Sequence, residues 1–174
     1  ALDTHQTRTV LVLASQVEPD YLARVALYAR RRGLMKDMPA LLLVVLSRRD
    51  PALFERVFPK VIDSPRLLRT FIKLVRSGKA GRRSFGSAVK RAIRRWLAER
   101  SEVQLFYASV GGDPSLADIV AMVHPRPATE ARRAFYGWLR GRPHDESLLP
   151  EEVRAYQRRL ADPTQPLPRV PFEM

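Results

Sequence analysis

Asp37-Met-Pro-Ala-Leu-Leu-Leu-Val-Val-Leu-Ser-Arg48 is the stretch that decides the fold of this chain of 174 residues. It holds the longest apolar run, Ala40 to Leu46, which follows a capping residue type, Asp37, and a first-turn proline, Pro39. An apolar run of this length is also compatible with a buried strand. We predict a helix up to about Arg48, because cap and proline signals precede the run and helix signals surround it.

The neighbouring segments carry boundary signals of the same kind. A capping residue type stands before a proline at Asp50-Pro51 and again at Ser64-Pro65. Gly33 ends the segment that opens near residue 20, and Pro59 is expected to end or kink the helix that starts at residue 51. Further helices are predicted to start near residues 87, 115, 129 and 150. No segment shows sustained alternation of β-branched residues, so the predicted fold class is all-α.

The spacing of the predicted helices favours a repeat architecture. Starts near residues 20, 51, 87 and 115 recur at intervals of 28 to 36 residues, as helical hairpins do in a HEAT-like solenoid. We therefore expect residues 1–174 to form a single α-helical repeat module. Residues 161–174 contain four prolines and are expected to be a connector that leads into further helices of a longer array.

The composition excludes several classes of protein. With no cysteine, the chain has no disulfide, no cysteine-based metal site and no thiol nucleophile. Its longest apolar run is far shorter than the roughly 20 residues of a membrane span, and its first residues lack the pattern of a signal peptide. We expect a cytoplasmic protein that does not enter a membrane.

The charge is strongly basic. Lys and Arg number 31 against 18 Asp and Glu, which gives a formal net charge of +13. Such a balance favours a polyanionic partner, with nucleic acid first and an anionic membrane surface second. The alternative is a chain that simply uses arginine for solubility.

The basic residues are concentrated in one stretch. Between Ser64 and Ala98 there is no acidic residue, while eleven are basic. At about 100° per residue, Arg66, Arg69, Lys73 and Arg76 share one arc of a helix, opposite Leu67, Leu68, Phe71, Ile72, Leu74 and Val75. In the next helix, Lys90, Arg91, Arg94 and Arg95 lie opposite Val89, Ile93, Trp96 and Leu97.

Unpaired basic faces repel themselves, because like charges four residues apart destabilise a helix. A face built only for solvation would mix in glutamate, so we interpret these faces as a binding surface for an anion and keep the solvated face as the alternative. The loop between the two helices adds Lys79, Arg82 and Arg83. Phe85 in this loop is the best aromatic candidate to stack on an unpaired base. Four other aromatic residues are predicted to lie in the core: Phe71, Trp96, Phe135 and Trp138.

Several motifs together resemble the TROVE module of the Ro autoantigen family, as a bacterial-type member without the von Willebrand A domain. In chain order they are Tyr21 to Gly33, Met35 to Leu41, Val61-Ile-Asp63, Leu68 to Phe71, Arg76-Ser-Gly78, Gly86 to Ile93 with Trp96-Leu97, Ser115 to Asp118, Val123 to Pro127 and Val170 to Met174. The resemblance implies part of a HEAT-like ring of helices. It also implies binding to small noncoding RNAs of the Y class and to single-stranded ends of misfolded RNAs.

The resemblance places two features at the RNA surface, the basic segment Gly86 to Ile93 and the histidine at position 124. By itself, His124 is also compatible with a histidine at a helix end that interacts with the helix dipole. The segment Phe106 to Asp113 contains no Lys or Arg, whereas animal members place basic residues there. General RNA binding therefore remains the expectation, and Y-type recognition stays open.

Signals for catalysis are weak. Gly81 to Ala88 resembles a phosphate loop but lacks the lysine and hydroxyl that should follow its second glycine. His144-Asp145-Glu146 has no second set of metal ligands nearby, and His5 and His144 are predicted to be isolated surface residues.

We therefore predict an RNA-binding module without catalysis, cofactor or metal. The candidate RNA-binding residues are Arg76, Lys79, Arg82, Arg83, Phe85, Ser87, Lys90, Arg91, Arg94, Arg95, His124 and Arg126. The expected partners are small noncoding RNA and single-stranded RNA ends, together with protein partners in a ribonucleoprotein. The alternative function is a helical-repeat scaffold whose groove binds a partner peptide.

Overall fold

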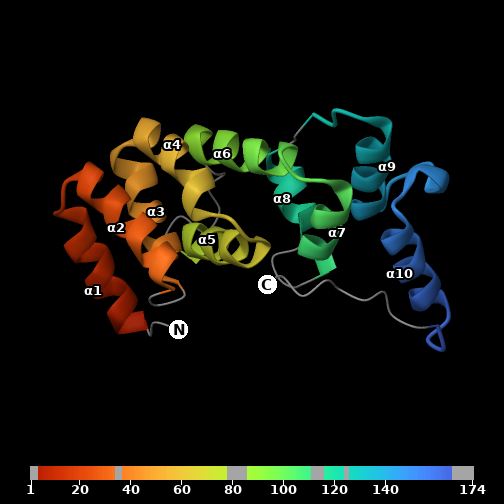
Figure 1. The fold of residues 1–174 in the computed structure, drawn as a ribbon, viewed down its shortest axis with the longest axis horizontal. Coiled ribbons are helices and arrows are strands. Elements are labelled where there is room, and N and C mark those ends of the chain that lie inside the picture. Colours follow the sequence, from red (N-terminus) through yellow and green to blue (C-terminus); the bar gives the residue numbers. More distant parts are fainter. Residues whose placement is uncertain (1–3, 34–36, 78–85, 111–115, 124–125, 166–174) are drawn as a thin grey trace. The chain divides into compact units, whose positions relative to one another are not determined.

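The computed structural model describes residues 4–33, 37–77, 86–110, 116–123 and 126–165. In these residues it contains ten α-helices, one 3-10 helix and no strand, so the all-α prediction is confirmed (Figure 1). The helices are α1 (Thr4–Ser15), α2 (Pro19–Arg32), α3 (Met38–Arg49), α4 (Pro51–Val61), α5 (Pro65–Ser77), α6 (Ser87–Ala98), α7 (Glu102–Val110), α8 (Leu116–Val123), α9 (Glu130–Leu139), η1 (Glu146–Leu148) and α10 (Glu151–Ala161). Two compact units, Ala1–Ile93 and Arg94–Met174, divide the chain inside α6.

The first unit is built around α3. Its residues from Pro39 to Leu46 are all buried, because α1, α2, α4 and α5 pack against it (Figure 1). A helix enclosed in this way needs no polar face, which explains why the apolar run is continuous. The prediction of a helix rather than a strand for this run is confirmed.

Three phenylalanines link α4 to α5 in the same unit. Phe54, Phe58 and Phe71 are each fully buried, and their ring centroids lie 5.3 to 5.9 Å apart. Edge and offset contacts at such distances contribute about 0.5–1.5 kcal/mol per pair beyond the burial of apolar area. This cluster fixes the inner side of α5 and so directs its basic side outward.

Two predicted boundaries of helices are confirmed. The Asp50 side chain accepts a hydrogen bond from the Leu53 amide at 2.9 Å, as an N-cap residue does. Gly33 ends α2 in the left-handed conformation with φ of 63°, which glycine adopts without a Cβ penalty.

Two other predicted boundaries differ in detail from the structure: Asp37 holds the predicted N-cap position of α3, and of the two outcomes predicted for Pro59, an end or a kink of the helix, the end is wrong. Asp37 does not cap α3 with its side chain, because its backbone (φ −104°, ψ −11°) is already helical rather than extended. Pro59 does not end α4, which continues to Val61. Because the buried Phe58 and Val61 flank this exposed proline, core packing offsets the missing amide hydrogen bond.

Two helices, α1 and α7, were not predicted from the sequence. The start of α7 carries a signal that could have revealed it, since Ser101 and Gln104 form a capping box. The Gln104 amide donates to the Ser101 hydroxyl at 3.3 Å, and the Ser101 amide donates to the Gln104 side chain at 2.9 Å. The first turn of α1 contains neither a proline nor an acidic residue, so these signals of a helix start are missing there.

The second unit packs α7 against α8, α9 and α10. Its core is aromatic, with the Phe106 ring centroid 5.9 Å from Trp138 and 5.6 Å from Tyr156 of α10. Phe135 lies 5.6 Å from the same tryptophan and is fully buried. Phe71, Trp96 and Phe135 are buried as predicted, whereas Trp138 is half-buried.

Arg132 of α9 is the one buried charged residue among those that the structure describes. Its guanidinium donates to the carbonyl oxygens of Leu97 (2.9 Å), Ala98 (3.2 Å) and Arg100, at the C-terminal end of α6. It also forms an ion pair with Glu102 at 3.3 Å. Carbonyls at a helix end lack intrahelical donors, so this arginine satisfies the end of α6, and its ion pair with Glu102 also connects it to the first residue of α7.

The Arg132→Met variant tests this role, because methionine keeps apolar bulk but donates no hydrogen bond. We expect the free energy of unfolding to fall by about 2–4 kcal/mol, since buried carbonyls and a carboxylate lose their partner. Urea denaturation followed by tryptophan fluorescence measures the change. The matched control is Arg133→Met at the neighbouring exposed position, which should shift stability by no more than about 0.5 kcal/mol. Equal stability of the two variants would contradict the assignment.

Candidate nucleic-acid interface

The basic face of α5 lies on the outer side of the first unit. The inner side buries Leu67, Leu68, Phe71 and Ile72. On the other side, Arg66 and Lys73 are exposed, and Arg69 and Arg76 are half-buried. The helix therefore presents its cations to solvent as the periodicity predicted.

The basic face of α6 has the same design. Six apolar residues are buried on one side: Ala88, Val89, Ala92, Ile93, Trp96 and Leu97. Arg91, Arg94 and Arg95 are exposed on the other side, and Lys90 is half-buried. The guanidinium carbon of Arg100 lies 3.6 Å from the Trp96 ring centroid, so a cation covers this tryptophan. Trp96 is only 1% exposed, so it is a core residue and offers no free ring to a base.

The prediction that the basic residues are entirely unpaired is wrong for Arg91. Its Nε donates to both carboxylate oxygens of Glu55 on α4, at 3.0 and 3.2 Å. The hydrogen bond from Glu55 raises the pKa of the Arg91 guanidinium above its usual value, and the charge of the carboxylate adds to this effect. The acidic partner lies outside the acid-free stretch, 36 residues earlier in the chain, where no local pattern indicates it.

Arg94 also has a structural partner. Its Nε donates to the carbonyl oxygen of Val123, the last residue of α8. A cation at a helix C-terminus is favourable, because the terminal carbonyls lack intrahelical donors and carry partial negative charge. This contact joins α6 to α8 without neutralising the charge of the arginine.

Lys90 and Arg95 are the cations of α6 that have neither a carboxylate nor a carbonyl partner among the residues that the structure describes. They are available to an external anion without the loss of an ion pair. Arg94 keeps its full charge as well, although one of its donors is occupied. Three of the four cations of α6 therefore keep a positive charge that no carboxylate among the described residues neutralises.

The remaining predicted residues fall into two groups. Ser87 is the exposed first residue of α6, Arg126 is exposed after α8, and Arg76 is half-buried near the end of α5. Five predicted residues lie outside the described part of the chain: Lys79, Arg82, Arg83, Phe85 and His124.

A pocket of about 280 Å³ opens beside the first turn of α5. Ser64, Arg66 and Thr70 contribute polar side chains to its wall, together with Arg30 from α2. Arg30 is paired with Asp63. Arg66 is therefore the cation of this pocket that has no carboxylate partner among the described residues.

Within the described ranges, no group of three or more His, Asp or Glu side chains could hold a metal ion, and no described helix is long and apolar enough to cross a membrane. His144 is half-buried rather than on the surface as predicted, and its Nδ1 lies 2.8 Å from the Arg142 carbonyl oxygen. Asp145 caps η1 through the Ser147 amide at 2.9 Å. Both side chains therefore form hydrogen bonds within their own turn.

Comparisons of the chain with protein-family models, with curated proteins and with solved structures found no match. The resemblance to the TROVE module therefore stays a prediction that is based on the quoted motifs.

Arg94 and Arg95 form a natural pair for testing the contact with α8. We expect Arg94→Ala to lower the free energy of unfolding by about 1 kcal/mol more than Arg95→Ala, because it alone removes a hydrogen bond to the Val123 carbonyl. Both variants introduce the same residue into the same helix, so helix propensity cancels. Urea denaturation of each variant gives the difference, and equal midpoints would refute the structural role of Arg94.

Proposed function

We propose that this chain binds RNA through the basic faces of α5 and α6 and has no catalytic activity. The observation that carries the proposal is the outward face of α6, where Lys90, Arg94 and Arg95 have no neutralising carboxylate among the described residues. Phosphate groups are the complementary partner, since cation–phosphate contacts supply most of the affinity of non-specific nucleic-acid binding.

The electrostatic cost of this face supports the proposal. Cations three and four residues apart repel each other, and Glu55 relieves only Arg91. A polyanion removes the remaining repulsion on binding and releases counterions at the same time. A partner peptide in a groove, the alternative function, explains neither the charge of the outer faces nor the absence of acidic residues from residue 64 to residue 98.

The finer features of the fold belong to the same proposal. We infer a HEAT-like solenoid of the TROVE type, supported by the quoted motifs and by consecutive helices that pack side by side within the first unit. The partner that follows is small noncoding RNA or misfolded structured RNA. Because Phe106 to Asp113 carries no cation, we do not extend the proposal to Y-type specificity.

The double variant Lys90→Glu/Arg95→Glu tests the proposal without disturbing Arg91 or Arg94, which have structural partners. We expect it to reduce affinity for a single-stranded RNA at least about tenfold, because two phosphate contacts become repulsive. Fluorescence anisotropy at low salt measures the dissociation constant. The matched control, Arg8→Glu/Arg56→Glu, makes the same change of charge at exposed positions of α1 and α4 and should retain most of the affinity.

The salt dependence provides an independent measure. If about six phosphates are neutralised, the slope of log K against log salt should be about −4 for single-stranded RNA. A flat dependence, or no RNA binding by the unaltered chain at low salt, would refute the proposal. A peptide partner that binds the double variant as well as the unaltered chain would favour the scaffold function instead.

Glu55→Gln provides a test in the opposite direction. Glutamine keeps the shape of the side chain but removes the charge that neutralises Arg91, so this arginine becomes available to a phosphate. We expect tighter RNA binding and a salt slope that is steeper by up to about 0.7. The anisotropy titration at several salt concentrations measures both quantities. Weaker binding by this variant would show that Arg91 does not belong to the RNA surface.

A further inference from the structure

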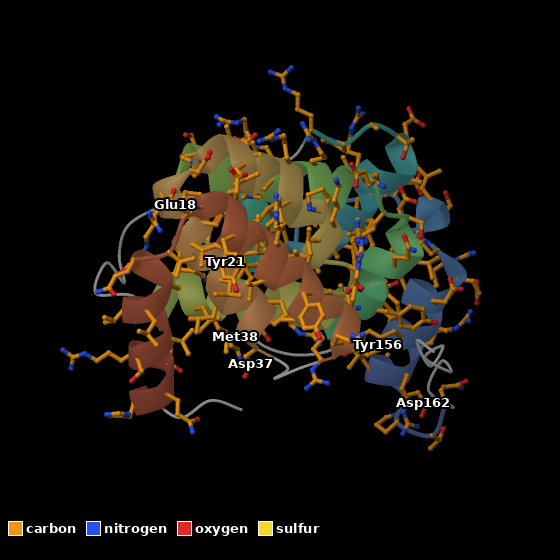
Figure 2. The ribbon with its side chains drawn as sticks, turned by 60° about the vertical axis from the view of Figure 1, so that its left-hand side comes forward. Glu18, Tyr21, Asp37, Met38, Tyr156 and Asp162 are labelled. Atoms are coloured by element: carbon orange, nitrogen blue, oxygen red, sulfur yellow. The ribbon has the colours of Figure 1, made fainter. Side chains whose placement is uncertain are left out.

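The exposed face of α2 carries two tyrosines that the basic stretch does not include. Tyr21 and Tyr28 are 61% and 55% exposed, and Figure 2 shows Tyr21 on the outer side of the helix. Residues seven apart lie on the same side of an α-helix, so both rings belong to one stripe. Their spacing along the helix axis is about 10 Å at 1.5 Å per residue.

These tyrosines are not needed to hold α2 in place. The opposite side of the helix buries Leu22, Ala23, Ala26 and Ala29, and it is this side that packs towards α3 and α4. A single exposed aromatic side chain is ordinary on a protein surface, but two on one stripe form a patch. We therefore expect this patch to contact a partner outside the unit.

Arginines flank the two rings. At 100° per residue, Arg24 and Arg31 fall on one edge of the tyrosine stripe and Arg32 on the other. The guanidinium carbon of Arg32 lies 5.7 Å from the Tyr28 ring centroid. Neither Arg24 nor Arg31 has a carboxylate partner within the part of the chain that the structure describes, and both are exposed.

This combination of groups matches the chemistry of unpaired nucleotides. Aromatic rings stack on the face of any base, and adjacent arginines bind the phosphates that connect the bases. The two residues are spaced about 10 Å along the helix axis, which exceeds the roughly 3.4 Å between stacked bases of one strand. Each ring therefore receives a separate base that has left the stack, which a duplex does not provide.

We propose that the Tyr21–Tyr28 face of α2 is a stacking site for unpaired bases of single-stranded RNA. The inference rests on the proposed function, because it takes RNA as the partner. Tyrosine and arginine are also common at protein interfaces. The net charge of +13 and the four arginines of α2 against its one acidic residue, Asp20, favour a polyanion over a protein surface of mixed charge.

The experiment compares two double variants of the full chain. Tyr21→Leu/Tyr28→Leu keeps apolar bulk and helix propensity but removes the rings, whereas Tyr21→Phe/Tyr28→Phe keeps the rings. Each is titrated by fluorescence anisotropy against a labelled 12-nucleotide uridine strand and against a duplex of the same length. We expect the leucine variant to bind the single strand about 30-fold more weakly or worse, with the affinity for the duplex unchanged, and the phenylalanine variant to bind as the unaltered chain does.

Crosslinking at 254 nm of the unaltered chain to the uridine strand, followed by mass spectrometry, gives a readout that does not depend on any variant. We expect uridine adducts on Tyr21 or Tyr28. Adducts confined to other peptides would overturn the inference even if the leucine variant failed to fold.

The outcomes separate the inference from the function on which it rests. A leucine variant that binds the single strand normally, or that loses single strand and duplex equally, overturns the stacking site while the basic face of α6 stands. A leucine variant that alters only self-association in light scattering assigns the face to a protein contact and also overturns it. If the unaltered chain binds neither RNA, the proposed function itself fails.

Discussion

The burial of the apolar run of α3 is the constraint on which the first unit depends. Eight consecutive side chains, from Pro39 to Leu46, have no route to solvent, so α1, α2, α4 and α5 must each turn an apolar side inward. Every charged or aromatic side chain of α2 and α5 that does not fit this arrangement is displaced to the outer side. The two candidate contact surfaces of this unit are thus the outer sides of helices that are anchored on the same core helix.

Burial of apolar side chains also explains how the basic helices tolerate their charge. Apolar burial contributes about 25 cal/mol per Å², and the buried set of α6 includes Ile93, Trp96 and Leu97. Repulsion between neighbouring cations costs only a few tenths of a kcal/mol per pair. The ion pair of Arg91 with Glu55 and the hydrogen bond from Arg94 to the Val123 carbonyl lower this cost further.

Features that depend on a few adjacent residues could be predicted from the sequence. The Asp50 cap, the left-handed Gly33 and the amphipathic pattern of α5 are local and are confirmed. The pairing of Arg91 with Glu55 joins residues 36 positions apart, so no window of sequence contains both. No local pattern distinguishes Arg132 from the other arginines of the chain, and only the packing of α9 against the turn after α6 makes it a buried donor.

The tyrosines of α2 belong to a third category, because the spacing shows that they share a side but not which side faces the core. Their exposure gives the two surfaces different roles under our proposals. Cations such as Lys90 and Arg95 meet phosphates, which every RNA presents whether folded or not. Stacking on Tyr21 and Tyr28 requires bases that have left their pairs. Among the described residues, selection of single-stranded ends over folded RNA therefore falls to α2 under these proposals, since the cations of α6 contact phosphates that both kinds of RNA present.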